Sequence, residues 1–463
     1  MASVPPVADN SARPSVLVVG AGFSGSLIAL HLLRKPHGPR VVLAERGREF
    51  GRGLAYGAAG RDHLLNVRAS NMSAFPDEPD HFARWLERES RLGPAGATFA
   101  FRSDYGAYVQ QLLREAAGDG RAAGRLELVA DAVVGIAPAG RGLLTHFAMG
   151  RTEPFDAVVL AVGTTPSPLP AAAPDALDHP RYVANPWAEG AFLGLRATDR
   201  VLLLGTGLTM VDVLQDLVDA GLEAPVRALS RRGLLPHRHA PAGPASASPG
   251  LDGRLSYALR GFREAADRGG DWRAAFDSLR PQTQALWRQM PDRERRRFLR
   301  HLRPFWDVHR HRQAPQVAAR VEALAADGRL NVSAGRLTEV RRRREALGVV
   351  WTPRGQRDIR EETVEWLVNC TGFEGDLTQS RDPLIRSALD QGLIRPHPLG
   401  LGLDVDQYGQ ALDGDGAASF RLTAVGPLTR GAFWECTAVP DIRTKAAELA
   451  IWLVGRLAQE GGR

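Results

Sequence analysis

Short apolar runs that end in glycine turns recur along the chain. Residues 16–25 and 201–210 share one order, in which four apolar residues lead into a Gly-x-Gly turn. Apolar residues with helical spacing follow both turns. A short, wholly apolar run is typical of a strand buried in a parallel sheet. The pattern therefore predicts an α/β chain in which one strand–turn–helix unit occurs twice.

The remaining pattern predicts further elements of both kinds. We expect helices over residues 80–92, 105–116 and 437–457, and strands within 126–136, 155–162, 330–332, 348–351, 364–370 and 422–425. Residues 255–324 are helical in composition and interrupt the alternation of strands and helices. We interpret that segment as a helical insertion, and the Pro- and Ala-rich residues up to 174 as a linker.

The first turn has the chemistry of a dinucleotide site. Gly20 permits the tight turn, Gly22 lets the backbone approach a pyrophosphate, and Gly25 lets the helix pack closely on the strand. The N–H groups around Phe23 and Ser24 then lie at the positive end of a helix. An ordinary βαβ turn is the alternative.

The acidic residue after the next strand limits which dinucleotides fit the first site. Glu45 follows the apolar residues 41–44. A carboxylate at this position accepts hydrogen bonds from the adenosine ribose and repels a 2′-phosphate. The first site therefore fits FAD or NAD and disfavours NADP.

The second turn has a different charge. Its strand leads into Gly205, Thr206, Gly207, Leu208 and Thr209, with Met210 at the position of a third glycine. The next strand, residues 226–229, ends in three residues that carry a hydroxyl and two guanidinium groups, namely Ser230, Arg231 and Arg232. These groups suit a 2′-phosphate, and hence NADPH. Two solvated arginines at a strand end are the alternative.

Composition sets the broad class. The chain has 463 residues, a formal charge of +7 and only two lysines, Lys35 and Lys445. This arginine bias is typical of a GC-rich bacterial genome, and because no nucleic-acid motif accompanies it we expect no nucleic-acid partner. Residues 1–14 form a polar lead-in, and no apolar run reaches membrane length. With two cysteines and no Cys-x-x-Cys, we expect a cytoplasmic protein.

The motifs together resemble a known group. The opening Val-Gly-Ala-Gly-Phe-Ser-Gly resembles flavin-containing monooxygenases and amine N-hydroxylases. Residues 51–72, 205–212, 230–236 and 306–311 are similar to the bacterial FAD-NAD(P)-binding family. The resemblance covers nearly the whole chain after Ser15.

This resemblance implies two Rossmann-like domains of the glutathione-reductase type, with the second inserted into the first. The FAD-binding domain would comprise residues 15–175 and 365–463. The NADPH-binding domain would comprise residues 176–364, with the helical insertion at about 251–325.

The resemblance also assigns residues to the cofactors. Those placed at FAD are Gly20, Gly22, Phe23, Ser24, Gly25, Glu45, Arg46, Asn66, Val133, Gly163, Gly426 and Thr437. Those placed at NADPH are Gly205, Thr206, Gly207, Leu208, Thr209, Ser230, Arg231 and Arg232. Asn66 and Met72 would lie on the flavin side of the reaction. At the carboxyl end, residues 426–431 stand where family members usually have a Gly-Asp pair.

The implied activity is that of an FAD- and NADPH-dependent oxidoreductase. One route is monooxygenation of a small amine or amino acid by molecular oxygen through a C4a-hydroperoxyflavin. A flavin reductase or dehydrogenase without oxygen insertion is the first alternative, and an FAD-binding regulatory or scaffold module is the second. The absence of a Cys-x-x-Cys disfavours a dithiol reductase.

Polar and aromatic residues of the helical insertion are candidates for substrate contact. They are Arg280, Gln284, Trp306, His309 and Arg312. Packing within the insertion is the alternative for each of them, because aromatic residues at helical spacing usually belong to a core. The histidines lack a third ligand at a metal-binding spacing, and we assign no metal.

Overall fold

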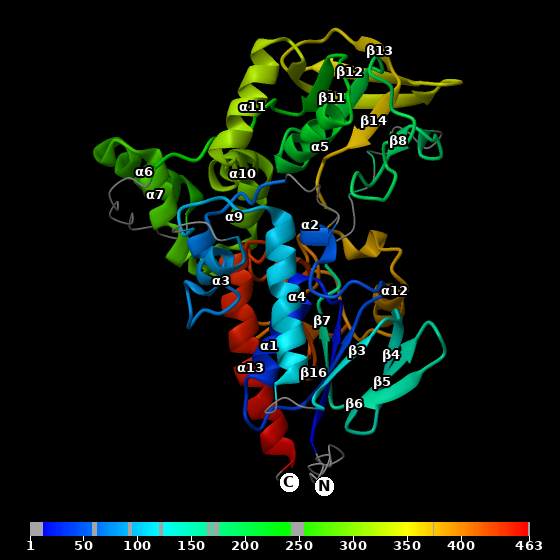
Figure 1. Cartoon of the computed structure of the whole chain (residues 1–463), viewed down its shortest axis with the longest axis vertical. Helices are drawn as coiled ribbons and strands as arrows, with labels where there is room; N and C mark the ends of the chain where they lie inside the picture. Colours follow the sequence, from blue (N-terminus) through cyan, green and yellow to red (C-terminus); the bar gives the residue numbers. More distant parts are fainter. Residues whose placement is uncertain are drawn as a thin grey trace. The chain divides into compact units, whose positions relative to one another are not determined.

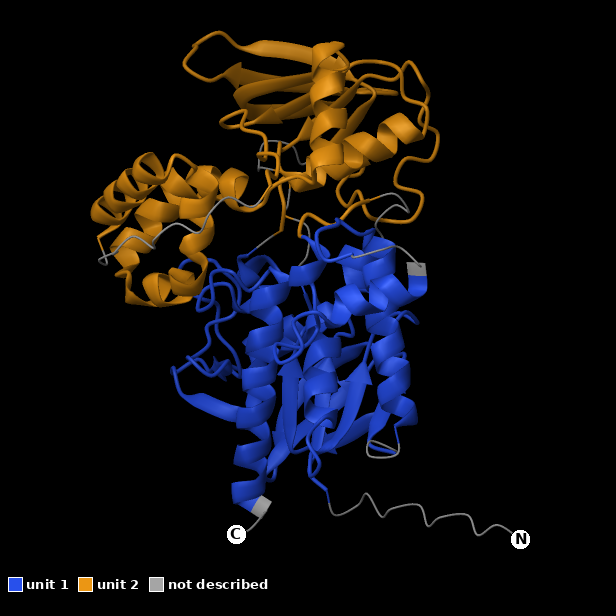
Figure 2. Cartoon of the chain, turned by 60° about the vertical axis from the view of Figure 1, so that its left-hand side comes forward, with its two compact units in different colours: residues 1–61, 68–164, 375–463 blue, residues 62–67, 165–374 orange. Residues whose placement is uncertain are grey.

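The chain, seen here as a computed structural model, divides into two compact units, which Figure 2 colours separately. The structure describes residues 13–57, 63–90, 95–119, 124–163, 167, 169, 176–241, 254–373 and 375–461. Unit 1 comprises residues 1–61, 68–164 and 375–463, and unit 2 comprises residues 62–67 and 165–374. Residues 1–12 of the expected lead-in and, apart from 167 and 169, residues 164–175 of the expected linker lie outside the described residues.

A six-stranded sheet in the order β15-β16-β7-β1-β2-β3 forms the centre of unit 1. All neighbouring strands are parallel except β15, which is antiparallel to β16. The bounds are β1 (Ser15–Val19), β2 (Arg40–Ala44), β3 (Leu126–Val129), β7 (Ala157–Leu160), β15 (Gln410–Leu412) and β16 (Ala418–Ala424). The strand order reverses at β1, and ligands of open α/β sheets bind outside the carboxyl ends of the strands at such a point.

Helices cover this sheet, and a small antiparallel sheet adjoins it. Helix α1 packs against α13 and α4, which lie beside it in Figure 1. Every residue of α1 is buried, which explains its apolar and small side chains. The helices are α1 (Phe23–Leu33), α2 (Gly53–Gly57), α3 (His81–Ser90), α4 (Arg102–Gly118), α12 (Pro383–Asp390) and α13 (Val439–Gly461). The small sheet contains β4 (Val133–Ala139), β5 (Gly142–Phe147) and β6 (Thr152–Phe155).

Unit 2 repeats the design with a seven-stranded sheet in the order β13-β12-β11-β10-β9-β14-β8. Strands β11, β10, β9, β14 and β8 are parallel, and β12 and β13 extend the sheet as antiparallel strands. The bounds are β8 (Tyr182–Val183), β9 (Val201–Leu204), β10 (Val226–Ser230), β11 (Leu330–Arg342), β12 (Leu347–Pro353), β13 (Arg360–Val364) and β14 (Trp366–Asn369). Strand β9 is followed by α5 (Leu208–Asp219), and the strand order reverses between β9 and β14.

The helical insertion lies between β10 and β11 in the sequence. It contains α6 (Leu255–Gly269), α7 (Trp272–Ser278), α8 (Thr283–Gln289), α9 (Asp292–Arg297), the π-helical turn η5 (Phe298–Leu302), α10 (Arg303–Arg310) and α11 (Pro315–Ala326). The sequence-based prediction of an α/β chain with a helical insertion is thus confirmed.

Two predicted boundaries differ from the structure. The sequence ends the first part of the FAD-binding domain at residue 175, whereas this part of unit 1 ends at residue 164. The sequence places the return to the first domain at residue 365, whereas β14 pairs with β9 and β8 in the sheet of unit 2. The chain returns to unit 1 at residue 375. An apolar strand that ends in a glycine turn has the same pattern in either sheet, so the pattern alone could not assign β14.

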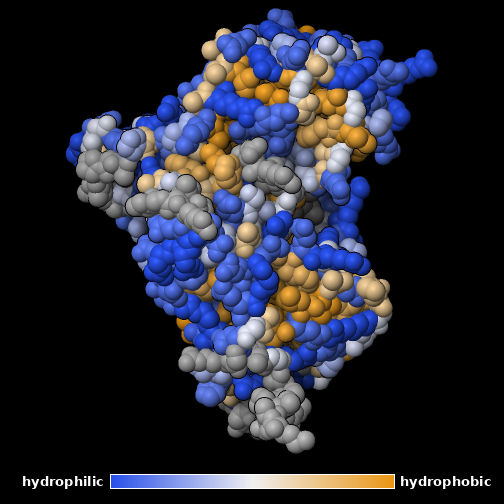
Figure 3. All heavy atoms as spheres, viewed as in Figure 1, coloured by the Kyte–Doolittle hydropathy of each residue, from blue (hydrophilic) through white to orange (hydrophobic). Residues whose placement is uncertain are grey.

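Hydrophilic and hydrophobic residues both contribute to the surface drawn in Figure 3. Hydrophobic residues gather on this face over β3 to β5, where Leu128 of the edge strand β3 is 44% exposed. Among the helices that the structure describes, none is long and apolar enough to cross a membrane.

His31 makes the stability of unit 1 sensitive to acid. Burial, followed by the cation of Arg34, lowers the pKa of His31 to about 4, and Asp77 opposes this shift. The unfolded chain then binds a proton more readily than the folded chain below about pH 6.5. We expect the free energy of unfolding to fall by up to about 3 kcal/mol on this account as the pH falls from about 6.5 to 4.

Urea unfolding of the full chain at several pH values checks this prediction. The substitution His31→Leu should make the loss of stability toward acid pH smaller, whereas His37→Leu, at an exposed histidine just after α1, should leave it unchanged. Equal pH dependence of the wild-type and His31→Leu proteins would contradict the prediction.

Candidate functional site: two glycine turns at strand ends

The first glycine of the turn in unit 1 is fixed between three strands. The Gly20 N–H donates to the Ala44 carbonyl at the end of β2, at 2.8 Å. Gly20 has a φ of +98°, and a Cβ atom there would lie 2.4 Å from the Ala161 carbonyl oxygen after β7. A side chain is therefore excluded by both the backbone conformation and the space.

The other two glycines serve different close approaches. A Cβ atom on Gly25 would lie 1.8 Å from the Gly20 carbonyl oxygen, so α1 packs directly on the turn. A Cβ atom on Gly22 would lie at an ordinary 3.5 Å from the Gly53 Cα atom. The fold thus requires glycine at position 25, while at position 22 it leaves space for a small side chain.

Unit 2 contains the same arrangement. The Gly205 N–H donates to the Leu229 carbonyl of β10 at 2.8 Å, and a Cβ atom on Gly205 would lie 2.3 Å from the Cys370 carbonyl oxygen after β14. The space around Gly207 is open, since a Cβ atom there would meet nothing within 4 Å. Met210, at the position of the third glycine, is fully buried in α5.

The helices that follow the two turns have uncapped N-termini. Gly22 precedes α1 and Gly207 precedes α5, and in neither helix does a backbone N–H donate to a capping side chain. Asp271 and Asp382 cap α7 and α12 with their carboxylates, whereas α4, α6 and α11 also lack a side-chain cap, so the glycine turn is what sets α1 and α5 apart. The first N–H groups of α1 and α5 therefore suit a bound anion such as a pyrophosphate.

Glu45 lies at the turn where the sequence predicts it. Its Oε2 atom accepts a hydrogen bond from the Ala21 N–H at 2.8 Å. The carboxylate is thereby oriented toward the turn, and its second oxygen is the one suited to a ribose hydroxyl. The neighbouring Arg46 instead lies 2.8 Å from Asp382, and its side chain is 65% exposed.

The other residues assigned to FAD occupy several elements of unit 1. Gly426, with a φ of +81°, approaches Ser24 so closely that a Cβ atom would lie 2.3 Å from the Ser24 Oγ atom. The end of β16 thus meets the start of α1. Val133 is buried at the start of β4, Gly163 has a φ of +74°, and Thr437 is exposed before α13. Contact of these last three with FAD is a prediction.

An aromatic cluster beside the first turn was not predicted from the sequence. The Phe23 ring at the start of α1 lies 5.9 Å from the Tyr56 ring and 5.6 Å from the Tyr105 ring. Tyr105 is completely buried, and its hydroxyl has no hydrogen-bond partner among the described residues. The sequence held one sign of this cluster, the glycine-rich run Gly-Arg-Gly-Leu-Ala-Tyr-Gly at residues 51–57. Gly53 of this run approaches Gly22 of the first turn, and Tyr56 follows three residues later.

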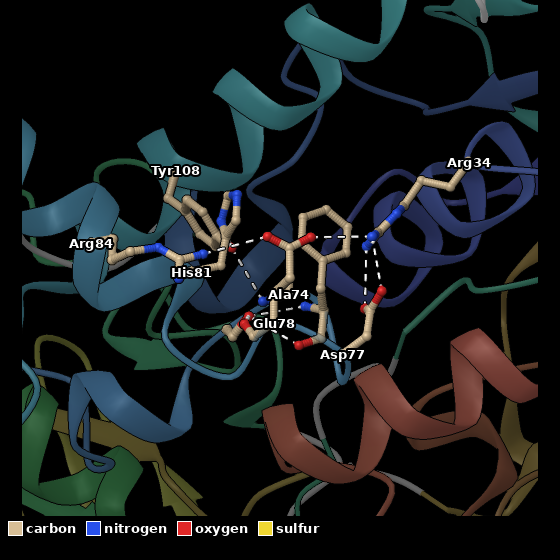
Figure 4. A network of polar contacts seen from close by, with 9 residues as sticks. Arg34, Ala74, Asp77, Glu78, His81, Arg84 and Tyr108 are labelled. Atoms are coloured by element: carbon tan, nitrogen blue, oxygen red, sulfur yellow. Dashed lines mark hydrogen bonds and ion pairs between the residues drawn. The ribbon is translucent and has the colours of Figure 1, made fainter.

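Met72 begins a loop that is fixed by buried polar contacts. Its side chain is 2% exposed. The Ala74 N–H donates to the Tyr108 hydroxyl at 3.2 Å, and this hydroxyl lies 2.8 Å from the His81 Nδ1 atom (Figure 4). The loop is therefore attached to both α3 and α4.

Ion pairs secure the next part of the same loop. Arg34, just after α1, lies 2.9 Å from Asp77 and 3.1 Å from Glu78, and Arg84 of α3 lies 3.4 Å from Glu78 (Figure 4). These pairs are partly exposed and individually weak. Together with the tyrosine contacts they hold the segment after Met72 in one conformation.

Asn66, the other flavin-side candidate, falls in unit 2. Its carbonyl accepts a hydrogen bond from the His239 Nε2 atom at 2.9 Å. Nearby in sequence, the buried His63 lies 2.8 Å from Asp216 of α5. The short segment 63–67 is thus anchored to the unit that carries the second turn.

The hydroxyl groups predicted at the second site hold the turn itself. The Thr206 and Ser230 hydroxyls are hydrogen-bonded at 2.9 Å, and Thr206 also lies 2.6 Å from the Leu234 carbonyl oxygen. The Gly233 N–H donates to the Ser230 hydroxyl at 3.0 Å. Ser230 therefore orders the loop after β10, in which the two arginines stand.

The two arginines of this loop differ in environment. Arg231 is exposed and forms no hydrogen bond or ion pair with any described residue. The Arg232 guanidinium lies over the Phe305 ring, 5.0 Å from its centroid, and donates to the His301 carbonyl at 3.4 Å. Arg231 is therefore free for an anionic ligand, and Arg232 joins the loop to the helical insertion.

A small hollow marks the point where the strand order reverses in unit 2. It is lined by Thr209 near the start of α5, by Asn369 at the end of β14, by Gly372 after β14 and by Trp187. Its volume of ≈ 10 Å³ accommodates about one water molecule. Leu208 starts the helix at the same place. Of the residues assigned to NADPH, those from Gly205 to Thr209 follow β9, and Ser230, Arg231 and Arg232 stand at the end of the neighbouring strand β10.

Three of the substrate-side candidates pack within the insertion. The Trp306 ring lies 4.8 Å from the Phe276 ring, and the His309 ring lies 4.6 Å from Trp272. Arg312 is 4% exposed and binds Asp277 with two hydrogen bonds of 2.8 and 3.1 Å. This arrangement favours the packing interpretation for these residues, because a paired and buried guanidinium is not available to a substrate.

The other two candidates lie near the turn between α7 and α8. Gln284 is partly buried, and its Oε1 atom is buried without a hydrogen-bond partner among the described residues. Arg280 opens the short helical turn before α8 and is half-buried. Gln284 therefore offers an unused acceptor, which a substrate N–H group would satisfy.

The cysteines are not suited to redox chemistry. Burial raises the pKa of the Cys370 thiol well above its usual range and that of Cys436 to about 12. A reactive thiol needs a lowered pKa. Within the described part of the chain, no three His, Cys, Asp or Glu side chains are grouped to hold a metal ion.

The glycines of the first turn give a prediction that separates fold from ligand. Gly25→Ala should destabilise unit 1 by about 1–3 kcal/mol, because the new methyl group meets the backbone of Gly20. Gly22→Ala should leave the stability of the flavin-free protein unchanged but lower its FAD content, because the methyl group stands where the phosphates approach.

Flavin absorbance per mole of purified protein, with thermal unfolding of the flavin-free form, measures both effects. Gly47→Ala is the matched control, since Gly47 is exposed and a Cβ atom there would meet nothing within 4 Å. Full FAD content in Gly22→Ala would contradict the assignment of the first turn.

Arg231 gives a prediction for the second turn. Arg231→Ala should weaken binding of NADP⁺ by about tenfold, the loss of one charge-assisted contact, and leave NAD⁺ binding unchanged. Isothermal titration with both nucleotides measures this, and Arg336→Ala, at an exposed arginine of β11, is the control. An equal loss for both nucleotides would refute recognition of the 2′-phosphate by Arg231.

Comparison with known proteins identifies the fold. The family model described as FAD-NAD(P)-binding matches residues 17–165. No curated protein matches the sequence. Among solved structures, the chain is similar to the reduced form of ornithine hydroxylase from Pseudomonas aeruginosa (15% identity, TM-score 0.66), ornithine N-hydroxylase from Kutzneria sp. 744 (16%, 0.67) and L-lysine 6-monooxygenase from Pseudomonas syringae (16%, 0.65). Each comparison covers 96% of this chain and 99% of the other. The chain therefore has the fold of flavoproteins with two dinucleotide-binding domains.

Proposed function

We propose that this chain is an FAD- and NADPH-dependent monooxygenase that hydroxylates a small amine or amino acid. One observation carries the proposal. Each unit has a glycine turn of the same design, followed by a helix whose N-terminus has no side-chain cap. The carboxylate of Glu45 lies beside the first turn, and the exposed Arg231 stands in the loop beside the second. One chain thus has separate places for a dinucleotide without a 2′-phosphate and for one that carries it.

The residues of unit 1 fit FAD. Gly22 leaves open the approach to the N-terminus of α1, and Glu45 is held at the turn by the Ala21 N–H. Gly426 lies against Ser24 and leaves the start of α1 free of a further side chain. When bound, FAD would accept two electrons from NADPH and pass them to molecular oxygen.

The residues of unit 2 fit NADPH. The open space around Gly207 admits a pyrophosphate to the N-terminus of α5, and Ser230 orders the loop that presents Arg231. The segment with Asn66 is anchored to this unit through His63 and His239. We propose that this segment lines the flavin-side end of the nicotinamide site.

The substrate class rests on the structural neighbours and on one side chain. The similar proteins are named as hydroxylases or monooxygenases of ornithine, lysine and cadaverine. In this chain, the buried Gln284 Oε1 atom, which has no hydrogen-bond partner among the described residues, would accept a hydrogen bond from an amine N–H. The two free, buried thiols are typical of the reducing cytoplasm, where we place the enzyme.

The balance of products distinguishes this proposal from its alternatives. With NADPH, oxygen and a series of amines that includes ornithine, lysine and cadaverine, we expect at least one amine to yield a hydroxylamine in proportion to the NADPH consumed. Product is measured by mass spectrometry and hydrogen peroxide by a peroxidase assay. The control omits the amine and should give slower NADPH consumption or hydrogen peroxide alone.

Two other outcomes would contradict the proposal in different ways. If NADPH is consumed and every amine gives only hydrogen peroxide, the chain is a reductase or oxidase for this series. If the purified protein takes up FAD but NADPH never reduces it, a binding module is the better interpretation.

A further inference from the structure

The helical insertion carries a row of arginines that the proposed function does not use. Arg293, Arg296, Arg297 and Arg300 are spaced by three, one and three residues along α9 and the π-helical turn η5. Residues at this spacing share one helix face. Together with His301 they line a hollow of ≈ 390 Å³ within unit 2.

Most of this positive charge is uncompensated. Arg297 lies 2.9 Å from Glu294, whose carboxylate also attracts Arg293 electrostatically. Arg293, Arg296 and Arg300 are exposed and form no hydrogen bond or ion pair with any described residue. Like charges on one helix face repel each other and destabilise the helix. A bound anion would offset this repulsion.

The neighbouring Arg295 shows how an arginine of this segment behaves when its role is structural. Its Nε atom donates to the Trp287 carbonyl at 3.0 Å, and its Nη2 atom donates to the Arg288 carbonyl at 3.1 Å. Its side chain is only 17% exposed. Arg293, Arg296 and Arg300 make no such contact with any described residue, so they do not serve the packing of the described part of the insertion.

The hollow adjoins the loop that we assign to the 2′-phosphate of NADPH. Arg232 donates to the His301 carbonyl at 3.4 Å and lies over the Phe305 ring, 5.0 Å from its centroid. His301 also lines the hollow. Through His301, the row of arginines on the insertion and the loop after β10 therefore border each other within one unit.

We propose that Arg293, Arg296 and Arg300 of the insertion form a second part of the 2′-phosphate site and determine the preference for NADPH over NADH. This inference rests on the proposed function of the second turn. A phosphate at the hollow can accept paired hydrogen bonds from planar guanidinium groups, which is the geometry that favours arginine at phosphate sites. The phosphate also carries nearly two negative charges, so it can pair with several arginines, whereas a carboxylate carries only one negative charge.

The test compares two triple variants of the full-length protein. In the first, Arg293, Arg296 and Arg300 are changed to Gln. In the second, three exposed arginines of α6 are changed to Gln, namely Arg260, Arg263 and Arg268. Both variants lose the same charge from the same insertion, and circular dichroism with thermal unfolding verifies that each is folded.

Isothermal titration supplies a readout that is independent of enzyme activity. The probes are NADP⁺, NAD⁺, 2′-AMP and 5′-AMP. In the first variant we expect binding of NADP⁺ and 2′-AMP to weaken by about tenfold, with NAD⁺ and 5′-AMP unchanged, and we expect a smaller dependence of NADP⁺ binding on salt. In the α6 variant all four affinities should equal those of the wild type.

The outcomes separate this inference from the proposed function. If the wild type binds NADP⁺ no more tightly than NAD⁺, the NADPH assignment itself fails. If the wild type discriminates and the first variant discriminates equally, only the role of the insertion is overturned. An equal loss in both variants would show a general effect of charge, and would also overturn it.

Discussion

The two sites depend on one close approach of backbone to backbone. In each unit the first glycine of the turn donates its N–H to the neighbouring strand, to Ala44 in unit 1 and to Leu229 in unit 2. On its other side it lies under the carbonyl of the strand across the switch point, where a Cβ atom would come within 2.4 Å of Ala161 and 2.3 Å of Cys370. Only glycine satisfies both contacts, so three strands end together and a helix N-terminus opens beside them.

Differences around this shared turn decide which ligand each site suits. Unit 1 needs Gly25 because α1 rests on the turn, whereas α5 of unit 2 buries Met210 at the same position. Glu45 lies beside the first turn and accepts a hydrogen bond from it, so the position of its negative charge is fixed by the backbone. In unit 2 the corresponding loop is ordered by a hydroxyl, Ser230, and the charge on it is positive. We therefore propose that the backbone geometry makes each turn a dinucleotide site, and that the side chains at the strand end select the dinucleotide.

The sequence was informative where structure is local. Strand runs, glycine turns and the helical insertion follow from periodicity and from glycine positions, and Glu45 and Arg231 lie where the pattern indicates. Contacts between distant segments had no such signal. The pairing of β14 with β9, the approach of Gly53 to Gly22 and the anchoring of His63 on Asp216 each join segments that are remote in sequence. Periodicity describes which face of an element is buried, but it does not name the partner that buries it.

The helical insertion shows the same limit most clearly. In the sequence, its aromatic and basic residues are equally suited to contact a substrate. In the structure, however, Trp306 packs on Phe276 and Arg312 binds Asp277. The arginines of α9 and η5 were not among the candidates that the sequence indicated. Partners distinguish the two groups, because a side chain whose hydrogen bonds are already made inside the insertion has little to offer a ligand. The groups of the insertion that remain available to a ligand are therefore of two kinds. They are the Oε1 atom of Gln284, which has no partner among the described residues, and the guanidinium groups at the hollow.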